Sequence, residues 1–167
     1  MAWRGVHFAV DDTTLSGLLC TPAAARADYV ANEIEENWES NFATETDKAW
    51  PLIHASLQGS NPEADGLERL YDKPVSWAVL GREFLDSDPN YLIALIQSRD
   101  VAAVASLLKS VSADDIIDRL GAAIDHFGCK NVGAAEARYA GEWFPNLEQF
   151  FQRAAEAKRH VIFTVDF

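Results

Sequence analysis

The chain has 167 residues, 49% of them hydrophobic and 24% charged, a composition typical of one globular domain rather than of a disordered segment. Its 26 acidic residues against 14 Lys and Arg give a net charge of −12, which argues against binding to nucleic acid or to an anionic membrane surface, because both need clustered cations. No apolar run approaches the roughly 20 residues that cross a bilayer, so we expect one soluble domain over residues 1–167.

The first twenty residues combine one arginine with several apolar residues, as a secretion signal does. Asp11 and Asp12 fall inside what would be its apolar region, which argues against a signal. The two cysteines, Cys20 and Cys129, are too far apart in sequence to suggest a metal-ligand pair or a disulfide framework. We therefore expect two buried free thiols in a reducing compartment, and a cytoplasmic protein.

Residues 3–10 alternate between apolar and other side chains and predict a strand. Asp11 and the three residues after it offer capping oxygens for a short helix through Leu15, Leu18 and Leu19. This start of the chain therefore predicts a strand followed directly by a helix.

Pro22 favours the start of a second helix, because its missing N–H needs no partner there. Val30, Ile34 and Trp38 are spaced four residues apart and predict one buried face. Acidic side chains gather around that face and predict a solvated surface. They are Glu33, Glu35, Glu36 and Glu39.

A third helix is predicted from an apolar stripe at helical spacing, formed by Trp50, Ile53, His54 and Leu57. Thr44, Thr46 or Asp47 can cap this helix. Pro51 is compatible with it only if the helix begins close to Asp47 and the proline falls in its first turn. A loop rich in turn residues follows at residues 59–66.

The apolar run of residues 75–80 is too short for periodicity to decide between helix and strand. Tyr91 to Ile96 predicts a buried strand, and Ser98 and Ser112 can each cap one of the two helices that follow.

Residues 143–154 carry a strong aromatic stripe and predict a helix that Pro145 must kink or restart. The apolar residues of 160–167 fall on both faces of a strand and predict a central strand covered by helices. The predicted fold class is α+β, a mixed α/β domain in which a small sheet with the N- and C-terminal strands packs against about six helices.

This order of segments resembles the YfbM-like family of uncharacterised bacterial proteins, DUF1877. The resemblance spans nearly the whole chain, and its most specific piece is the run Asp47-Lys48-Ala49-Trp50 with His54 four residues after the tryptophan. It implies a single-domain α/β fold and no catalytic motif. Members of such families sometimes accompany bacterial toxins as immunity proteins.

Asp47, Trp50 and His54 are the best candidate for a functional site. If the helix begins at Asp47, the tryptophan and the histidine share one face, and a histidine beside a carboxylate can act as a general base. The alternative is structural: Asp47 caps the helix, Trp50 fills the core, and His54 bonds a backbone carbonyl. Arg82 is a further candidate, either for binding a carboxylate ligand or for an ion pair within the protein.

No motif predicts a cofactor, a metal ion or a nucleophile. The chain lacks a Gly-x-Ser-x-Gly elbow, a glycine-rich phosphate loop and short spacings between metal-ligating residues. We therefore expect no cofactor and no metal site.

Two functions follow from these observations. The first is a non-catalytic binding protein, in particular an immunity protein that neutralises a basic toxin through its acidic surface. The acids expected there are Glu33, Glu35, Glu36, Glu39, Glu45, Asp86, Asp88, Asp114 and Asp115. The alternative is a small-molecule-binding or hydrolytic enzyme with a cleft around His54, Trp50 and Asp47. A buried His54 favours the first function, and a His54 that lines an open pocket favours the second.

Overall fold

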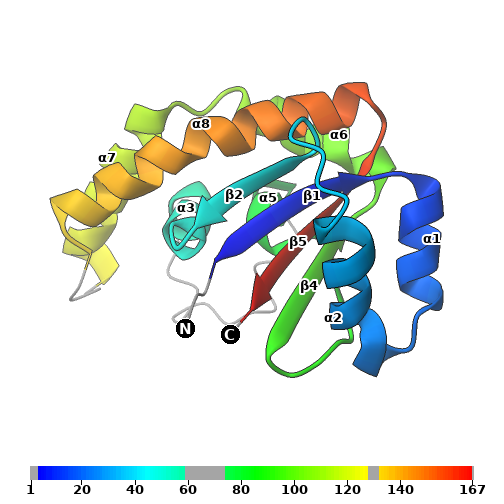
Figure 1. The fold of residues 1–167 in the computed structure, drawn as a ribbon. Helices are drawn as coiled ribbons and strands as arrows, with labels where there is room; N and C mark the ends of the chain where they lie inside the picture. The colour runs from blue at the N-terminus through cyan, green and yellow to red at the C-terminus, as the bar shows by residue number, and fades with distance from the viewer. Residues whose placement is uncertain (1–3, 59–73, 128–131, 167) are drawn as a thin grey trace.

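Five strands form one antiparallel sheet across the middle of the protein (Figure 1). Their order in the sheet is β2-β1-β5-β4-β3, so the first and last strands of the chain lie side by side near its centre. The strands are β1 (Gly5–Val10), β2 (Ala43–Asp47), β3 (Glu83–Leu85), β4 (Tyr91–Ile96) and β5 (His160–Asp166).

The computed structural model describes residues 4–58, 74–127 and 132–166, with side chains for all of these except 122–127. The predictions for Trp3 and Cys129 and the predicted loop at residues 59–66 lie outside the described residues.

Helices cover both faces of the sheet (Figure 1). One face carries α1 (Asp12–Cys20) and the segment η1 (Ala23–Ala25), α2 (Arg26–Tyr29) and η2 (Val30–Glu35), of which η2 is a π-helix. The opposite face carries α3 (Trp50–Gln58), α5 (Pro74–Leu80), α6 (Ser98–Leu108), α7 (Ala113–Phe127) and α8 (Ala134–Glu156).

The central strand β5 is buried on both sides, as its sequence predicts. Val161, Phe163 and Val165 pack into the core beneath α3, α5, α6, α7 and α8, whereas Ile162 packs into the core beneath α1 and η2. Successive side chains of a strand point to opposite faces, so a strand with apolar residues on both faces needs a layer of helices on each side. The predicted α+β class is confirmed.

The clearest wrong prediction concerns residues 43–47. Thr44, Thr46 and Asp47 were expected to cap a helix but belong to β2, which pairs with β1. The hydroxyl of Thr46 donates to the backbone oxygen of Gly5 at 3.2 Å, which shows that a side chain suited to helix capping also serves a strand.

The segment after Pro22 departs from a regular helix. It is divided into η1, α2 and η2, and the wider turn of the π-helix changes which side chains face the sheet. Val30 and Ile34 are buried as expected, but Trp38 is 44% exposed and touches Phe8 edge-on.

Two further boundaries refine the sequence predictions. The undecided run at residues 75–80 belongs to the helix α5, and the 23-residue helix α8 runs through Pro145 without restarting. Ser98 is the first residue of α6 rather than its cap, whereas the Ser112 hydroxyl accepts from the Asp115 N–H at 3.1 Å and caps α7 as predicted. Among the described helices, none combines the length and apolarity that a membrane-spanning segment requires.

Candidate functional site

Asp47, Trp50 and His54 do not share one helix. Asp47 is the last residue of β2, and α3 begins at Trp50, so the condition that this helix begins at Asp47 is not met. Pro51 does fall in the first turn of α3, where a missing N–H leaves no hydrogen bond unmade. The Trp50 ring is half-buried and lies edge-on to Phe163 at a centroid distance of 5.7 Å.

His54 is an interior side chain, only 2% exposed. Gln58 Nε2 donates to His54 Nε2 at 2.8 Å, so the partner of the ring is a side chain rather than a backbone carbonyl. His54 Nδ1 has no hydrogen-bond partner among the described residues. Burial lowers the pKa of His54 to about 4, because the charged ring loses its hydration. The imidazole is therefore neutral and shielded from any substrate in solution.

Asp47 makes its contacts in a different direction. Among the described residues it accepts a hydrogen bond from the Tyr139 hydroxyl and pairs with Arg4, whose Nε lies 3.3 Å from Oδ1. Burial, and then the hydrogen bond and charge of Asp47, raise the pKa of Tyr139. Asp47 thus links the end of β2 to α8, and its backbone takes a positive φ of 44° to do so.

Arg82 forms an ion pair within the protein. Its Nη1 lies 2.6 Å from Asp100 Oδ2, and its guanidinium lies 4.8 Å from the centre of the Trp77 ring. Arg99 Nε also lies 3.6 Å from the same Asp100 oxygen. The Arg82 side chain is 47% exposed, so this pair contributes little to stability.

The acidic segment on η2 and beyond is fully accessible. Its four glutamates, Glu33, Glu35, Glu36 and Glu39, are all exposed, while Ile34 between them is buried and holds the segment on the sheet. The nine acids expected to share one face do not all do so. Asp114 and Asp115 belong to α7 in the opposite layer, and Asp115 accepts hydrogen bonds from the backbone and hydroxyl of Ser112.

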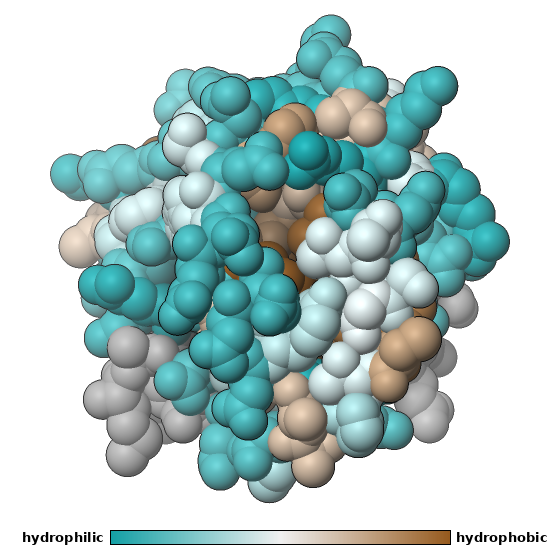
Figure 2. Space-filling model, turned by 45° about the vertical axis from the view of Figure 1, so that its right-hand side comes forward, coloured by the Kyte–Doolittle hydropathy of each residue, from teal (hydrophilic) through white to brown (hydrophobic). Residues whose placement is uncertain are grey.

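A pocket that no sequence motif predicted lies beside this acidic segment. Its floor includes the buried apolar side chains Phe8, Val10 and Ile34, and its volume is about 100 Å³. Figure 2 shows a hollow with a hydrophobic floor and a mainly hydrophilic rim on the side turned forward from Figure 1. Such a volume suits one side chain or a small ligand rather than a nucleotide, since pockets for larger ligands run to about 300–1,000 Å³.

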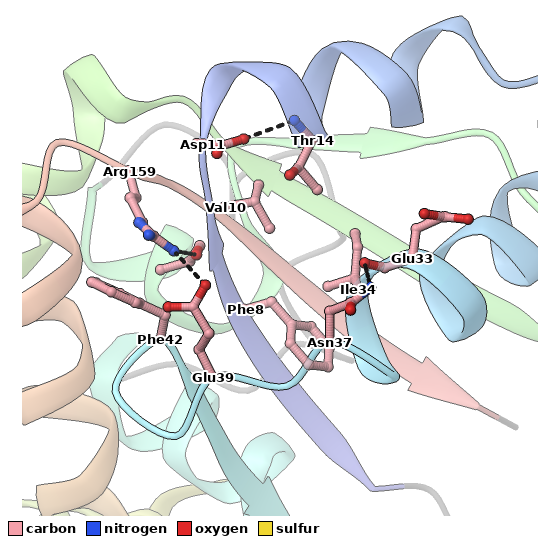
Figure 3. Close-up of a pocket in the computed structure, with 11 residues that line it drawn as sticks. Phe8, Val10, Asp11, Thr14, Glu33, Ile34, Asn37, Glu39, Phe42 and Arg159 are labelled. Atoms are coloured by element: carbon pink, nitrogen blue, oxygen red, sulfur yellow. Dashed lines mark hydrogen bonds and ion pairs between the residues drawn. The ribbon is translucent and has the colours of Figure 1, made fainter.

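Charged side chains of both signs stand around the rim (Figure 3). Arg159 Nη1 donates to the Ala9 carbonyl at 3.1 Å and lies 3.9 Å from Glu39 Oε1. The same guanidinium lies 3.6 Å from the centre of the Phe42 ring. Asp11 accepts from the Thr14 N–H at 2.8 Å, a bond that lowers the pKa of the Asp11 carboxyl.

Strand pairing explains why these residues meet. β1 and β5 are antiparallel and Val10 lies opposite His160, so the residues just beyond, Asp11 and Arg159, come to the same end of the sheet. Knowledge that the first and last strands pair would have placed these two residues together. No local pattern predicts that Phe42 and Glu39 join them, because the loop before β2 brings them there.

The remaining described histidines have structural partners. The His7 ring is fully buried, 4.6 Å from the Phe163 ring, and its Nε2 donates to the Ala78 carbonyl at 3.0 Å. His160 bonds to Asp12 and to the backbone of Ser98. Over the described part of the chain, no three His, Cys, Asp or Glu side chains converge in a way that could hold a metal ion.

Comparison with known proteins supports the fold. The structure resembles YfbM from Escherichia coli, described as a protein of unknown function, with a TM-score of 0.68 and 17% identity over 99% of each chain. At that identity the likeness concerns the fold alone. No curated protein matches the chain. A family model described as "Domain of unknown function (DUF1877)" matches residues 1–164, and the chain therefore belongs to the DUF1877 family.

Proposed function

We propose that this protein is a non-catalytic binding protein whose acidic segment, defined as Glu33–Glu39, docks a basic protein partner. The supporting observation is that all four glutamates of the segment are exposed beside a half-exposed Trp38, while Ile34 fixes the segment to the sheet. An aromatic ring among fixed charges is a typical anchor of protein interfaces.

Neighbouring acids extend this surface. The Tyr91 hydroxyl donates to Glu35 at 3.2 Å, and the Tyr91 N–H donates to the Asp88 carbonyl at 2.9 Å. Arg26 Nη1 donates to the carbonyl of Asp86 at 2.7 Å and ties α2 to the same loop. Asp86 and Asp88 are both exposed, so their carboxylates add to the negative charge next to the acidic segment.

A surface of this charge favours fast association with a basic partner. Exposed carboxylates steer cations over about a Debye length, roughly 8–10 Å at physiological salt, and like-charged proteins are repelled over the same range. The net charge of −12 adds to this effect. Association is therefore expected to slow steeply as salt is added.

In its narrower form, the proposal is that the partner is a basic toxin and the chain is an immunity protein that neutralises it in the cytoplasm. Cys20 is exposed, so the expectation that its thiol is buried is wrong, but a free thiol at this position supports a reducing compartment.

The alternative of an enzyme with a cleft around His54, Trp50 and Asp47 needs an accessible imidazole. The 2% exposure of His54 does not favour it.

The test uses the basic proteins encoded by flanking genes, each titrated against the purified chain by biolayer interferometry. A variant with four substitutions neutralises the acidic segment: Glu33→Gln, Glu35→Gln, Glu36→Gln and Glu39→Gln. We expect it to lose at least tenfold in association rate at low salt, because electrostatic steering raises such rates by about 10–10³.

A matched control removes four exposed acids from the opposite layer: Asp114→Asn, Asp118→Asn, Glu142→Gln and Glu156→Gln. Both variants have the same net charge, so only the position of the charge differs. The control should retain most of the association rate. Equal losses in the two variants would show that net charge alone acts, and the absence of any bound basic partner would remove the proposal.

A further inference from the structure

We propose that the pocket between β1, η2 and Arg159 receives one lysine or arginine side chain of the basic partner. This inference rests on the proposed function and adds to it a specific anchoring site. The pocket has an apolar floor and an excess of carboxylates at its rim, and a long cationic side chain has the same two parts: an aliphatic stem and a charged end.

The floor fits the stem. Phe8, Val10 and Ile34 are 3%, 6% and 6% exposed, so they already belong to the core beneath α1 and η2 and cannot move aside easily. The pocket has a volume of about 100 Å³ and one water needs about 10–15 Å³, so there is room for roughly seven to ten water-sized groups. An arginine side chain has seven non-hydrogen atoms and a lysine side chain has five, so the pocket has room for either.

The rim fits the charge. Three carboxylates line the pocket, those of Asp11, Glu33 and Glu39, against the one guanidinium of Arg159. Glu39 is 62% exposed and its Oε1 lies 3.9 Å from Arg159 Nη1, a distance too long for a direct hydrogen bond. Glu39 is thus held near the pocket by charge while its oxygens can still accept from an incoming cation.

Arg159 does not make the pocket a site for anions. Its Nη1 donates to the Ala9 carbonyl, and its guanidinium plane covers the Phe42 ring, so it acts as a wall of the pocket (Figure 3). An anionic ligand would also have to approach through the exposed glutamates of the acidic segment. Charge complementarity therefore selects a cation.

Small probes test the site without a partner. N-acetyl-lysine methylamide and N-acetyl-arginine methylamide carry the two candidate side chains, and N-acetyl-norleucine methylamide carries the stem without the charge. Titrated into ¹⁵N-labelled protein, either cationic probe should shift the backbone amides of Ala9, Val10 and Asn37 at millimolar concentration. The norleucine probe should shift them at least about fivefold less at the same concentration.

Two asparagines of the same surface offer a matched pair of variants. Asn37 lines the pocket and donates to the Glu33 carbonyl at 2.9 Å, whereas Asn32 lies outside it and donates to the Asp28 carbonyl at 2.8 Å. Both are exposed, so neither substitution should disturb folding. Asn37→Lys places a cation at the pocket and should abolish the amide shifts that the cationic probes cause. Asn32→Lys adds the same charge outside the pocket and should leave these amide shifts unchanged.

The outcomes separate the two proposals. If cationic and norleucine probes shift the same amides equally, or if Asn37→Lys and Asn32→Lys behave alike, the pocket is not a cation site, whatever the partner does. If the probes bind as expected but no basic protein binds the acidic segment, the pocket inference holds and the proposed function fails. If the partner binds, Asn37→Lys should weaken its affinity at least about tenfold more than Asn32→Lys.

Discussion

His160 Nδ1 accepts a hydrogen bond from the backbone N–H of Ser98 at 3.0 Å, across 62 residues of sequence. Ser98 is the first residue of α6, and its N–H is one of the donors that a helix leaves unpaired at its start. On its other side, His160 Nε2 donates to Asp12 at 2.8 Å. The first residue of β5 thus caps a helix and fixes its own tautomer at the same time.

Removal of this imidazole should therefore expose the helix start. We expect His160→Ala to lower the free energy of unfolding by about 2 kcal/mol, which combines a lost cap with a small cavity. His160→Asn can place an amide oxygen near the position of Nδ1 and should recover about half of that loss. Urea unfolding of the three proteins measures the difference. If the asparagine variant is no more stable than the alanine variant, the acceptor at Nδ1 is not what stabilises α6.

Burial makes two other histidines sensitive to acid. Burial lowers the pKa of His7 to about 3 and that of His54 to about 4, although the hydrogen bond to Ala78 acts the other way on His7. Below about pH 6.5 the unfolded chain binds protons at both sites and the folded chain does not. The free energy of unfolding should therefore fall on acidification, by about 1.4 kcal/mol per pH unit for each histidine.

Variants isolate this effect from that of other groups. His7→Gln and His54→Gln each remove one titrating site, and each should reduce the slope of stability against pH by about 1.4 kcal/mol per unit between about pH 6 and pH 4.5. The gap in stability between the natural protein and each variant should narrow as the pH falls. Urea titrations across this range give the slopes, and parallel curves would mean that the rings are protonated in the fold.

The sequence predicts the elements whose own residues show which sides are buried, and it misses elements that are recognised only by the strands they pair with. The stripe of α3 was found because burial on one side imposes a helical period, and β5 was found because apolar residues occur on both of its faces. The strand β2 was missed because Thr44 and Thr46 suit a helix cap as well as a strand, and β3 is only three residues long.

The candidate site was harder to predict for the same reason. Asp47, Trp50 and His54 lie close in sequence, yet a change from strand to helix between them sends their side chains to different partners. The pocket, by contrast, is assembled from β1, η2, the loop before β2 and the residue before β5. Only the pairing of distant strands creates it, and no local spacing records that pairing.

Two glycines should respond in opposite directions to the same substitution. Gly81 has a φ of +66°, and a Cβ there would lie 2.8 Å from both the Ala94 Cβ and the Leu95 backbone nitrogen. Gly121 lies in α7, where a Cβ would meet nothing within 4 Å. Gly81→Ala should therefore destabilise the protein by about 2 kcal/mol or more, while Gly121→Ala should stabilise it by up to about 1 kcal/mol.

Thermal unfolding of both alanine variants checks this pair. The direction in which each variant shifts the melting temperature matters more than the size of the shift. Gly121→Ala controls for the general effect of removing a flexible residue from the unfolded chain. A Gly81→Ala protein as stable as the natural one would contradict the left-handed turn that joins α5 to β3.

Lys158 ends α8 in the left-handed region, with a φ of 54°. Its N–H donates to the Ala155 carbonyl at 3.1 Å and the Arg159 N–H to the Ala154 carbonyl at 3.0 Å, the pair of bonds of a Schellman motif. This turn delivers Arg159 to the wall of the pocket.

A side chain with a Cβ is strained in the left-handed conformation of Lys158, so Lys158→Gly should raise the free energy of unfolding by about 0.5–1 kcal/mol. Lys158→Ala removes the same charge and keeps the Cβ, so it should show no such gain. Urea unfolding of the two variants compares them directly, and a glycine variant no more stable than the alanine variant would mean that the helix end carries no backbone strain.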